Sequence, residues 1–183
     1  MKSILILGAG QFAQVTNEIA VANGYEKIGF LDDHSVNAVG KLDEYANFVS
    51  DYEYAIVAID DPLVRIKYTA KLKSAGFKVP ALIHPTAYIS PSAQIGDGCV
   101  VEPKAIIHTA ATVEDCSIIS VGAVINHHSR VCEACHISCN STVMQNSMVK
   151  SATTTLCGQL YFVEPSLKNT DAWMANYSFD DGI

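Results

Sequence analysis

The sequence has few basic residues and no long apolar run. Its 12 lysines and arginines are outnumbered by 19 aspartates and glutamates, which gives a net charge of -7 over 183 residues. A general surface for nucleic acid or an anionic membrane needs a basic face, so neither is expected as a partner. No stretch approaches the roughly 20 apolar residues of a membrane span, and Met1–Gly8 runs into a fold motif instead of a signal-peptide cleavage site. We expect a cytoplasmic protein that holds any anionic ligand at a local site.

The six cysteines are expected to be reduced thiols, because the chain shows no export signal. The segment Cys132-Glu-Ala-Cys135-His136 has the spacing of a c-type haem attachment motif. However, it lies inside a six-residue repeat, where Cys135 takes a position that is always small. Four ligands along one extended coil also converge poorly on a tetrahedral metal. We therefore expect neither haem nor zinc, and interpret these cysteines as small apolar side chains.

The first eighty residues alternate strands and helices. The expected strands are Ser3–Leu7, Ile28–Leu31, Tyr54–Ile59 and Val79–Ile83, and the expected helices are Gln11–Asn23 and Asp61–Gly76. Asp61-Pro62 supplies the N-cap and first residue of the second helix. The pattern predicts a small parallel α/β domain, a Rossmann-like half-domain, over residues 1–82.

From Ile83 to Val149 the sequence repeats every six residues without an insertion. The first position of all twelve hexads is Ile or Val, and the fifth is always Ala, Ser, Cys or Thr. Twelve buried Ile or Val side chains at roughly 1.5 to 3 kcal/mol each give a gross apolar term of tens of kcal/mol, which is an upper bound. The repeat predicts a parallel β-helix over residues 83–166. Residues 167–183 have no hexads and are expected to form a C-terminal cap or tail.

A glycine-rich turn links the first expected strand to the first helix. Gly8-Ala9-Gly10-Gln11-Phe12 precedes the helix, and Asp32 and Asp33 end the next strand. A backbone nest at a helix N-terminus favours phosphate, and a carboxylate after the second strand suits ribose or base groups. A nucleotide-linked sugar is expected in preference to NAD, because one short sheet offers half of the platform that NAD spans. The alternative is that the glycines serve only a tight turn.

Three of the six histidines lie close together at His127, His128 and His136. They occupy the third, fourth and sixth hexad positions, so none points into the core, and His108 lies about one 18-residue coil below His127. An exposed histidine is by default solvated and without function. A histidine in a crevice between subunits suits a general base. A three-histidine metal site across a trimer interface is the third possibility, although the spacing differs from that of γ-class carbonic anhydrases.

Three motifs in order resemble one family of bacterial sugar O- and N-acyltransferases. They are Gly8-Ala-Gly with Tyr25–Asp33, Ile83-His-Pro-Thr-Ala with Ser90-Pro-Ser-Ala, and Gly122–His128 with Cys135-His136-Ile. Together they are similar to the sialic-acid O-acetyltransferase and nucleotide-sugar N-acetyltransferase type, from residue 1 to about Leu160. The resemblance implies a left-handed β-helix, a homotrimer, and an N-terminal domain that grips a UDP-amino-sugar. It also implies direct acyl transfer in surface-glycan biosynthesis from acetyl-CoA, or another acyl-CoA, with no metal.

The resemblance also assigns roles to individual residues. His127 falls on the catalytic base, with His128 beside it, and His136 and Gly158 fall next to the acyl donor. The expected substrate-binding residues are Gly8, Gly10, Gln11, Phe12, Asp32, Asp33 and Asp61.

The chain departs from the family pattern at several places. Gly10-Gln11-Phe12 replaces a Gly-Gly-His or Ser-Gly-His segment, and Asp60-Asp61-Pro62 replaces a Gly-Asp-Asn-like turn. His128 stands where an acidic residue follows the base, and Ser120 stands at a common Asn site. The chain diverges after Leu160, where the family continues through further hexads. Two alternatives follow: a catalytically impaired trimeric β-helix protein that binds nucleotide-sugar or serves as an assembly subunit, and a metal-dependent β-helix hydratase.

Overall fold

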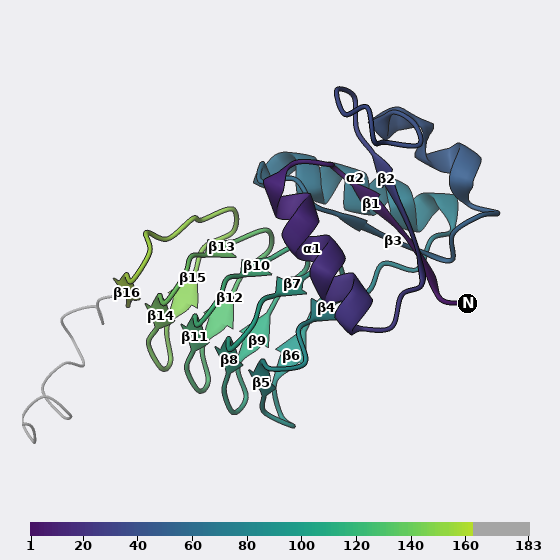
Figure 1. The fold of residues 1–183 in the computed structure, drawn as a ribbon. Coiled ribbons are helices and arrows are strands. Elements are labelled where there is room, and N and C mark those ends of the chain that lie inside the picture. The colour runs from purple at the N-terminus through teal and green to yellow at the C-terminus, as the bar shows by residue number, and fades with distance from the viewer. Residues whose placement is uncertain (163–183) are drawn as a thin grey trace, which may run out of the picture.

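The chain folds into a small α/β part followed by a parallel β-helix (Figure 1). The computed structural model describes residues 1–162. The α/β part contains β1 Ser3–Leu7, α1 Gln11–Ala22, β2 Lys27–Leu31, the 3-10 helix η1 Leu42–Phe48, β3 Tyr54–Val57 and α2 Pro62–Ala75. No helix in the described range is both long enough and apolar enough to cross a bilayer.

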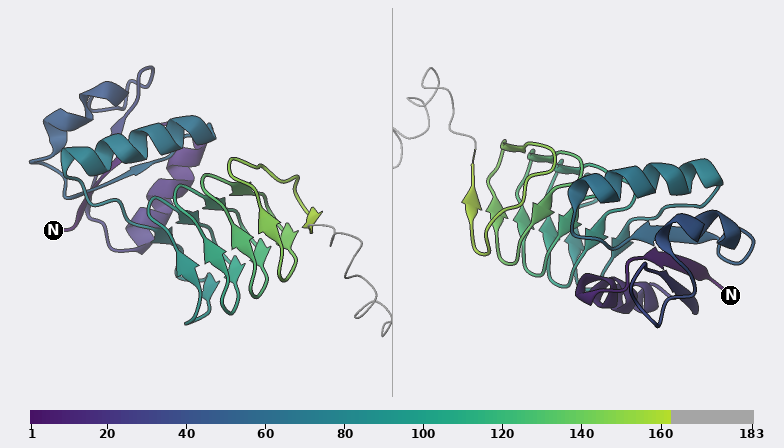
Figure 2. Two further views of the ribbon diagram at one scale, coloured as in Figure 1. Left: turned by 180° about the vertical axis from the view of Figure 1, so that it is seen from behind. Right: turned by 90° about the horizontal axis from the view of Figure 1, so that it is seen from above.

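Helices α1 and α2 cover opposite faces of a three-stranded parallel sheet, as Figure 2 also shows. The strand order is β2-β1-β3. Side chains alternate along the central strand, so Ile4 and Ile6 pack on the α1 side while Leu5 and Leu7 pack on the α2 side. Both faces of β1 are therefore buried, which explains why its sequence is a continuous apolar run.

The two helices begin differently. Asp61 caps α2, because its Oδ1 accepts two backbone hydrogen bonds of 2.8 and 3.0 Å and Pro62 takes the first helical position. Helix α2 ends at Gly76, whose φ of 101° gives the left-handed cap. Helix α1 begins at Gly10 without a capping side chain and without an acidic residue in its first turn. The N–H groups at the start of α1 are thus left open to an anion.

The hexads form a left-handed β-helix with three parallel sheets, which confirms the predicted fold class. The sheet orders are β13-β10-β7-β4, β16-β14-β11-β8-β5 and β15-β12-β9-β6. The strands are β4 Leu82–Ile83, β5 Tyr88–Ile89, β6 Gln94–Ile95, β7 Val100–Val101, β8 Ile106–Ile107, β9 Thr112–Val113, β10 Ile118–Ile119, β11 Val124–Ile125, β12 Arg130–Val131, β13 His136–Ile137, β14 Thr142–Val143, β15 Met148–Val149 and β16 Leu160–Tyr161. Paired residues are 18 apart, as in Val101, Ile119 and Ile137. Each coil therefore consists of three hexads.

The fourth position of the hexads has left-handed backbone all along the helix. Every sixth residue from Gly98 to Gly158 has a φ between 54° and 69°. The residues at these turns are Gly98, Lys104, Ala110, Cys116, Gly122, His128, Ala134, Asn140, Asn146, Ala152 and Gly158. Eight of them are not glycine, so the coil ladder holds the left-handed turn with alanine, cysteine and polar residues as well as with glycine.

The α/β part packs against the first coils through the sheet that contains β4 and β7. Leu82 and Val100 point outward from these strands and lie in one apolar cluster with Ile4 and Ile6. Asn23, the C-cap of α1, donates from Nδ2 to the carbonyl of Ile83 at 2.9 Å. Figure 1 shows α1 lying across this junction.

Arg65 of α2 fastens the two parts together from a fully buried position. Its Nε donates to the carbonyl of Cys116 at 2.8 Å and its Nη2 donates to that of Ala134 at 2.7 Å. Its Nη1 donates to the carbonyls of Ile59 and Asp60 at 3.1 and 2.7 Å. Cys116 and Ala134 take the same turn position in adjacent coils. One guanidinium therefore joins two coils to the loop that follows β3.

The structure differs from the sequence-based expectation in two places. Val79–Ile83 does not add a strand to the α/β sheet, because Leu82 and Ile83 pair with β7 as the first rung of the β-helix. The 3-10 helix η1 was not expected, although Leu42, Tyr45 and Phe48 recur every three residues along it and pack against the α2-side core. The expected cap or tail at 167–183 and the last residues of the expected β-helix lie outside the described range.

Candidate functional site

The loop between β1 and α1 leaves space where a phosphate could sit. Gly8 has a φ of +110°, and a Cβ there would lie 2.6 Å from the carbonyl oxygen of Ala58, so the turn requires glycine. A Cβ on Gly10 would meet nothing within 4 Å. The absence of a side chain at Gly10 is therefore not needed for packing within the described chain. It leaves the start of α1 accessible to a ligand.

Asp32 is used to order this loop. Its Oδ2 accepts the N–H of Ala9 at 2.9 Å, and its Oδ1 accepts the N–H groups of His34 and Ser35, both at 2.9 Å. These hydrogen bonds, with that from His34 the largest effect, hold the pKa of Asp32 below its usual value. The carboxylate thus ties the glycine-rich turn to the loop after β2 as a fixed negative charge.

The other expected nucleotide-site residues surround the carboxyl ends of the strands. Asp33 is exposed and accepts the N–H of Leu42 at 3.1 Å, and the exposed Asp61 caps α2. Gln11 is exposed at the first position of α1, whereas Phe12 is half-buried against the α1-side core. Gln11, Asp33 and Asp61 are accessible to a ligand, whereas Phe12 is largely used for packing.

His127 lies in the turn between β11 and β12 beside two other histidines. Its ring centroid is 5.9 Å from that of His108, which confirms the prediction that these two residues lie one coil apart on the same side of the β-helix. Its centroid is 5.3 Å from that of His128, with the rings nearly perpendicular. Asn126 supports the turn by accepting the N–H of His127 on its side-chain oxygen at 2.8 Å.

His127 and His128 share one hydrogen bond between their Nδ1 atoms, which are 3.1 Å apart. One of these atoms must carry the proton and the other must accept it. If His127 is the donor, its Nε2 keeps a free lone pair, which is the form that a general base needs. His128 can therefore orient the His127 ring by hydrogen bonding, although it brings no negative charge.

His136 begins β13 at the edge of the junction with the α/β part. The residues at the same outward position in the preceding coils, Leu82, Val100 and Ile118, are apolar and buried. The imidazole is half-buried, and Ser120 Oγ lies 2.9 Å from its Nε2. Burial, followed by the positive charge of Arg65, lowers the pKa of His136, so the neutral form is favoured.

His127 and His136 lie on different sheets of the β-helix. His127 follows β11 at the end of one sheet, whereas His136 belongs to β13 in another sheet, and no hydrogen bond within residues 1–162 joins them. Gly158, the other residue expected near the acyl donor, takes the left-handed turn position just before β16. It is exposed, and a Cβ there would meet no other atom within 4 Å. Its N–H donates to the carbonyl of Cys139 at 2.8 Å.

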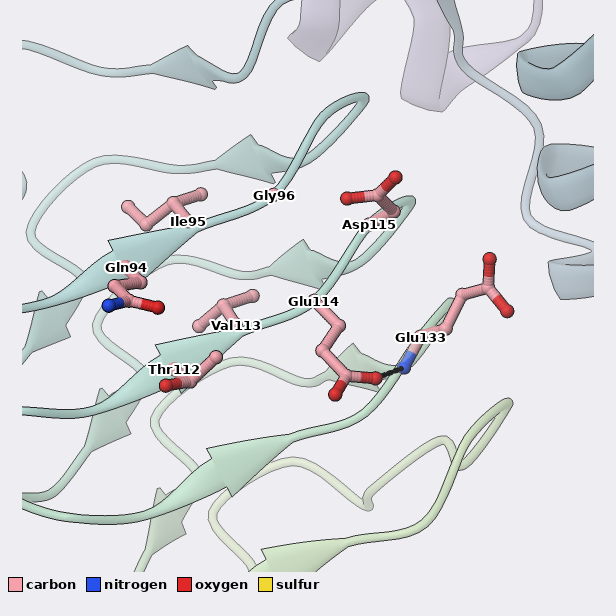
Figure 3. Close-up of a pocket in the computed structure, with 8 residues that line it drawn as sticks. All are labelled: Gln94, Ile95, Gly96, Thr112, Val113, Glu114, Asp115 and Glu133. Atoms are coloured by element: carbon pink, nitrogen blue, oxygen red, sulfur yellow. Dashed lines mark hydrogen bonds between the residues drawn. The ribbon is translucent and has the colours of Figure 1, made fainter.

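A pocket of about 420 Å³ lies on a different face, over β6, β9 and β12 (Figure 3). Two of its three acidic side chains already have partners, since Glu114 accepts the N–H of Glu133 at 3.0 Å and Asp115 pairs with Lys73 at 3.0 Å. None of the expected site residues lines this pocket. Within the described range, no three His, Cys, Asp or Glu side chains are grouped to hold a metal ion. All six cysteines are free thiols, and Cys135 is buried in the β-helix core.

Two features of this region were not expected from the sequence. Arg65 lies in a helix of mixed polarity, and nothing in its neighbourhood marks it as a buried contact to another part of the chain. Glu102 and Ser120 stack one coil apart next to His136, and their spacing of 18 residues is a signal that the hexads already contain.

Comparisons with known proteins agree with this architecture. Residues 3–72 match the family model of the PglD N-terminal domain. The acetyltransferase domain of PglB from Neisseria gonorrhoeae FA1090, in complex with acetyl coenzyme A, is 30% identical with a TM-score of 0.71, over 86% of this chain and 83% of that one. PerB from Caulobacter crescentus, in complex with CoA and GDP-perosamine, is 24% identical with a TM-score of 0.71, over 87% of this chain and 91% of that one, and shows the shared fold.

Proposed function

Because this chain belongs to the family of left-handed β-helix sugar acyltransferases, we propose that it transfers an acetyl group from acetyl-CoA to an amino or hydroxyl group of a nucleotide-linked sugar. The observation that carries the proposal is the likeness to the acetyl-CoA-bound acetyltransferase domain across both the α/β part and the β-helix. The open start of α1 and the exposed Gly10 support a diphosphate site at the α/β end.

In the proposed reaction His127 acts as the general base. The sugar nitrogen or oxygen attacks the thioester carbonyl carbon, the new bond to carbon forms, and the C–S bond breaks to release the CoA thiolate. His127 Nε2 takes the proton of the attacking group, while its Nδ1–H donates to His128. No covalent enzyme intermediate is required. His136 and Gly158 are proposed to lie beside the acyl donor.

We propose that the active unit is a homotrimer with the donor between neighbouring β-helices. The separation of His127 and His136 within one protomer supports this arrangement, because a second copy can bring one group opposite the other. The six free thiols and the expected substrates favour the cytoplasm, and a nucleotide-linked amino sugar favours surface-glycan biosynthesis.

A specific observation keeps a second function in view. The neighbour of His127 is a histidine instead of an acidic residue, and a neutral histidine brings no negative charge to a base. The second candidate is therefore a trimer that binds nucleotide-sugar with little catalysis. Free thiol release from acetyl-CoA with UDP-4-amino-sugars tests the enzyme directly, and loss of the signal in His127→Ala is the expected result. A His127→Ala protein that keeps the full rate would exclude His127 as the base.

Ligand binding can be tested without turnover. A ligand that binds the native state raises its melting temperature, so a thermal-shift panel separates the alternatives. Stabilisation by both UDP-sugars and CoA esters supports the acyltransferase. Stabilisation by UDP-sugars alone supports the binding protein, and a response to Zn²⁺ or Fe²⁺ alone supports a metal-dependent hydratase.

A further inference from the structure

Three polar residues from successive coils lie in contact at the corner after the β4-containing sheet. Glu102 follows β7, Ser120 follows β10 one coil later, and His136 begins β13 in the next coil. The backbone ladder holds them in register, since the N–H of Glu102 donates to the carbonyl of Ile119 and that of Ser120 to the carbonyl of Ile137, both at 2.9 Å. Adjacent coils lie about 4.8 Å apart, which is within the reach of a side-chain hydrogen bond.

The contacts run in one direction through the stack. The Glu102 carboxylate accepts the N–H of Val121 at 2.9 Å, which holds it beside Ser120. The Ser120 hydroxyl lies 2.9 Å from His136 Nε2, and its proximity to the Glu102 carboxyl lowers the pKa of that group. Among the described residues, none is hydrogen-bonded to His136 Nδ1.

The number of protons available decides which group donates and which accepts along these three residues. An ionised carboxylate only accepts hydrogen bonds, and a hydroxyl has one proton to donate. A Ser120 hydroxyl that donates towards the neighbouring Glu102 carboxylate must accept from His136, which requires the proton of the imidazole to be on Nε2. Nδ1 then carries the lone pair and is free to accept.

We propose that Glu102 and Ser120 are positioning residues that fix His136 as the Nε2–H tautomer, with Nδ1 presented as a hydrogen-bond acceptor to a donor group of a substrate. The identity of that donor rests on the proposed function: it is the attacking amine or hydroxyl of the sugar, or an amide N–H of the pantetheine arm. The tautomer itself does not depend on the proposed function. Arg65, Asp60 and Cys139 are the other charged or titratable groups near this chain, and none replaces Ser120 at Nε2.

Glu102 acts only as an acceptor while its carboxyl is ionised. Burial is the largest effect on its pKa and raises it, whereas the Val121 N–H and the Ser120 hydroxyl lower it by smaller amounts. The burial of His136 itself, followed by the positive charge of Arg65, disfavours the imidazolium. These two effects keep His136 neutral, the state in which the choice of tautomer matters.

The tautomer can be read directly by two-bond ¹⁵N–¹H correlation NMR on ¹⁵N-histidine-labelled full-length protein, with the His136 signals assigned from a His136→Gln variant. We expect wild type to show the Nε2–H form as the dominant tautomer. Ser120→Ala should lower the ratio of the Nε2–H to the Nδ1–H form at least severalfold, and Ser120→Thr, which keeps the hydroxyl, should restore it. Ser138→Ala is the matched control, because Ser138 takes the same hexad position one coil on and its hydroxyl donates to the carbonyl of Thr155.

A dominant Nδ1–H form in wild type, or an unchanged ratio in a folded Ser120→Ala protein, would overturn the proposal. Glu102→Gln gives a second reading, because an amide can donate to Ser120 and reverse the chain, so the ratio should again fall. If acyl transfer is detected, Ser120→Ala should lower kcat about tenfold or more while Ser120→Thr recovers most of it. If no acyl transfer is found, the NMR result still tests the tautomer, so the two failures remain distinct.

Discussion

Arg65 Nη2 donates to the carbonyl of Ala134 at 2.7 Å, two residues before His136. The same guanidinium donates to the carbonyls of Ile59 and Asp60, in the loop that follows the third strand of the α/β part. The loop at the carboxyl edge of the sheet and the coil that contains His136 are thus joined through one side chain. We expect the distance between the proposed sugar site and His136, which is proposed to lie beside the acyl donor, to depend on this contact.

Replacing Arg65 by leucine should destabilise the protein by about 3 kcal/mol or more. The change leaves four carbonyl acceptors in the junction without their donor, and each buried unsatisfied group costs about 1 to 3 kcal/mol. Urea unfolding followed by circular dichroism measures the loss. Arg130→Leu is the control, because Arg130 is exposed and pairs with Glu114 at the surface, where such pairs contribute under about 1 kcal/mol. Equal losses in the two variants would mean that Arg65 does not fasten the junction.

Alanine at the two turn glycines should separate folding from binding. Gly8→Ala combines a φ of +110° with a clash against the Ala58 carbonyl, so we expect a loss of the order of 1 to 3 kcal/mol. Gly10→Ala has a φ of -78° and open space, so its stability should stay within about 1 kcal/mol of wild type. Its methyl group should nevertheless reduce the thermal shift that a UDP-sugar produces. A Gly10→Ala protein with the full thermal shift would place the diphosphate elsewhere.

Changes at His128 should alter the rate through His127. His128→Phe keeps an aromatic ring but removes the acceptor for Nδ1–H, and we expect kcat for thiol release to fall about tenfold or more. His128→Asp supplies a charged acceptor and should match or exceed the wild-type rate. Asn146→Ala changes the same turn position one coil on and should leave the rate unchanged. A His128→Phe protein as fast as wild type would show that the base does not need this partner.

Acidification should destabilise the protein in part through His136. Its folded pKa lies below the reference value of 6.5, so the unfolded chain binds the proton first as the pH falls. The contribution of neutral His136 to the free energy of unfolding is therefore fully present above pH 6.5 and decreases as the pH falls below 6.5 towards the folded pKa. In urea unfolding between pH 8 and pH 5, His136→Gln should lose less stability than wild type. Parallel curves for the two proteins would contradict a depressed pKa at this site.

The β-helix could be predicted from sequence because each hexad specifies its own place. Ile119 and Cys135 are buried as their positions require, and the ring contact of His108 with His127 follows from the 18-residue coil. The left-handed turns could also have been found, since Gly98, Gly122 and Asn140 recur at one hexad position.

Other features depend on how the two parts dock, which no local pattern encodes. Arg65 has the sequence context of a surface residue, and its partners are backbone carbonyls whose side chains give no signal. Asp32 presents a different difficulty within the α/β part: it was expected to bind ligand, and in the structure its carboxylate accepts three backbone N–H groups that order the loop after β2. Ligand-site residues and loop-ordering residues share the same residue types, so sequence alone does not separate them.

The left-handed turns have a consequence for how such a chain can diverge. Because the ladder sets the backbone at every sixth residue, the path of the coil is the same whether the turn holds Lys104, Ala110 or His128. A mutation at one of these positions exchanges the group displayed on the surface without redirecting the main chain. The β-helix therefore displays side chains at a series of equivalent turn positions. A new catalytic or binding group can be acquired, moved by one coil or lost at these positions with little loss of fold stability.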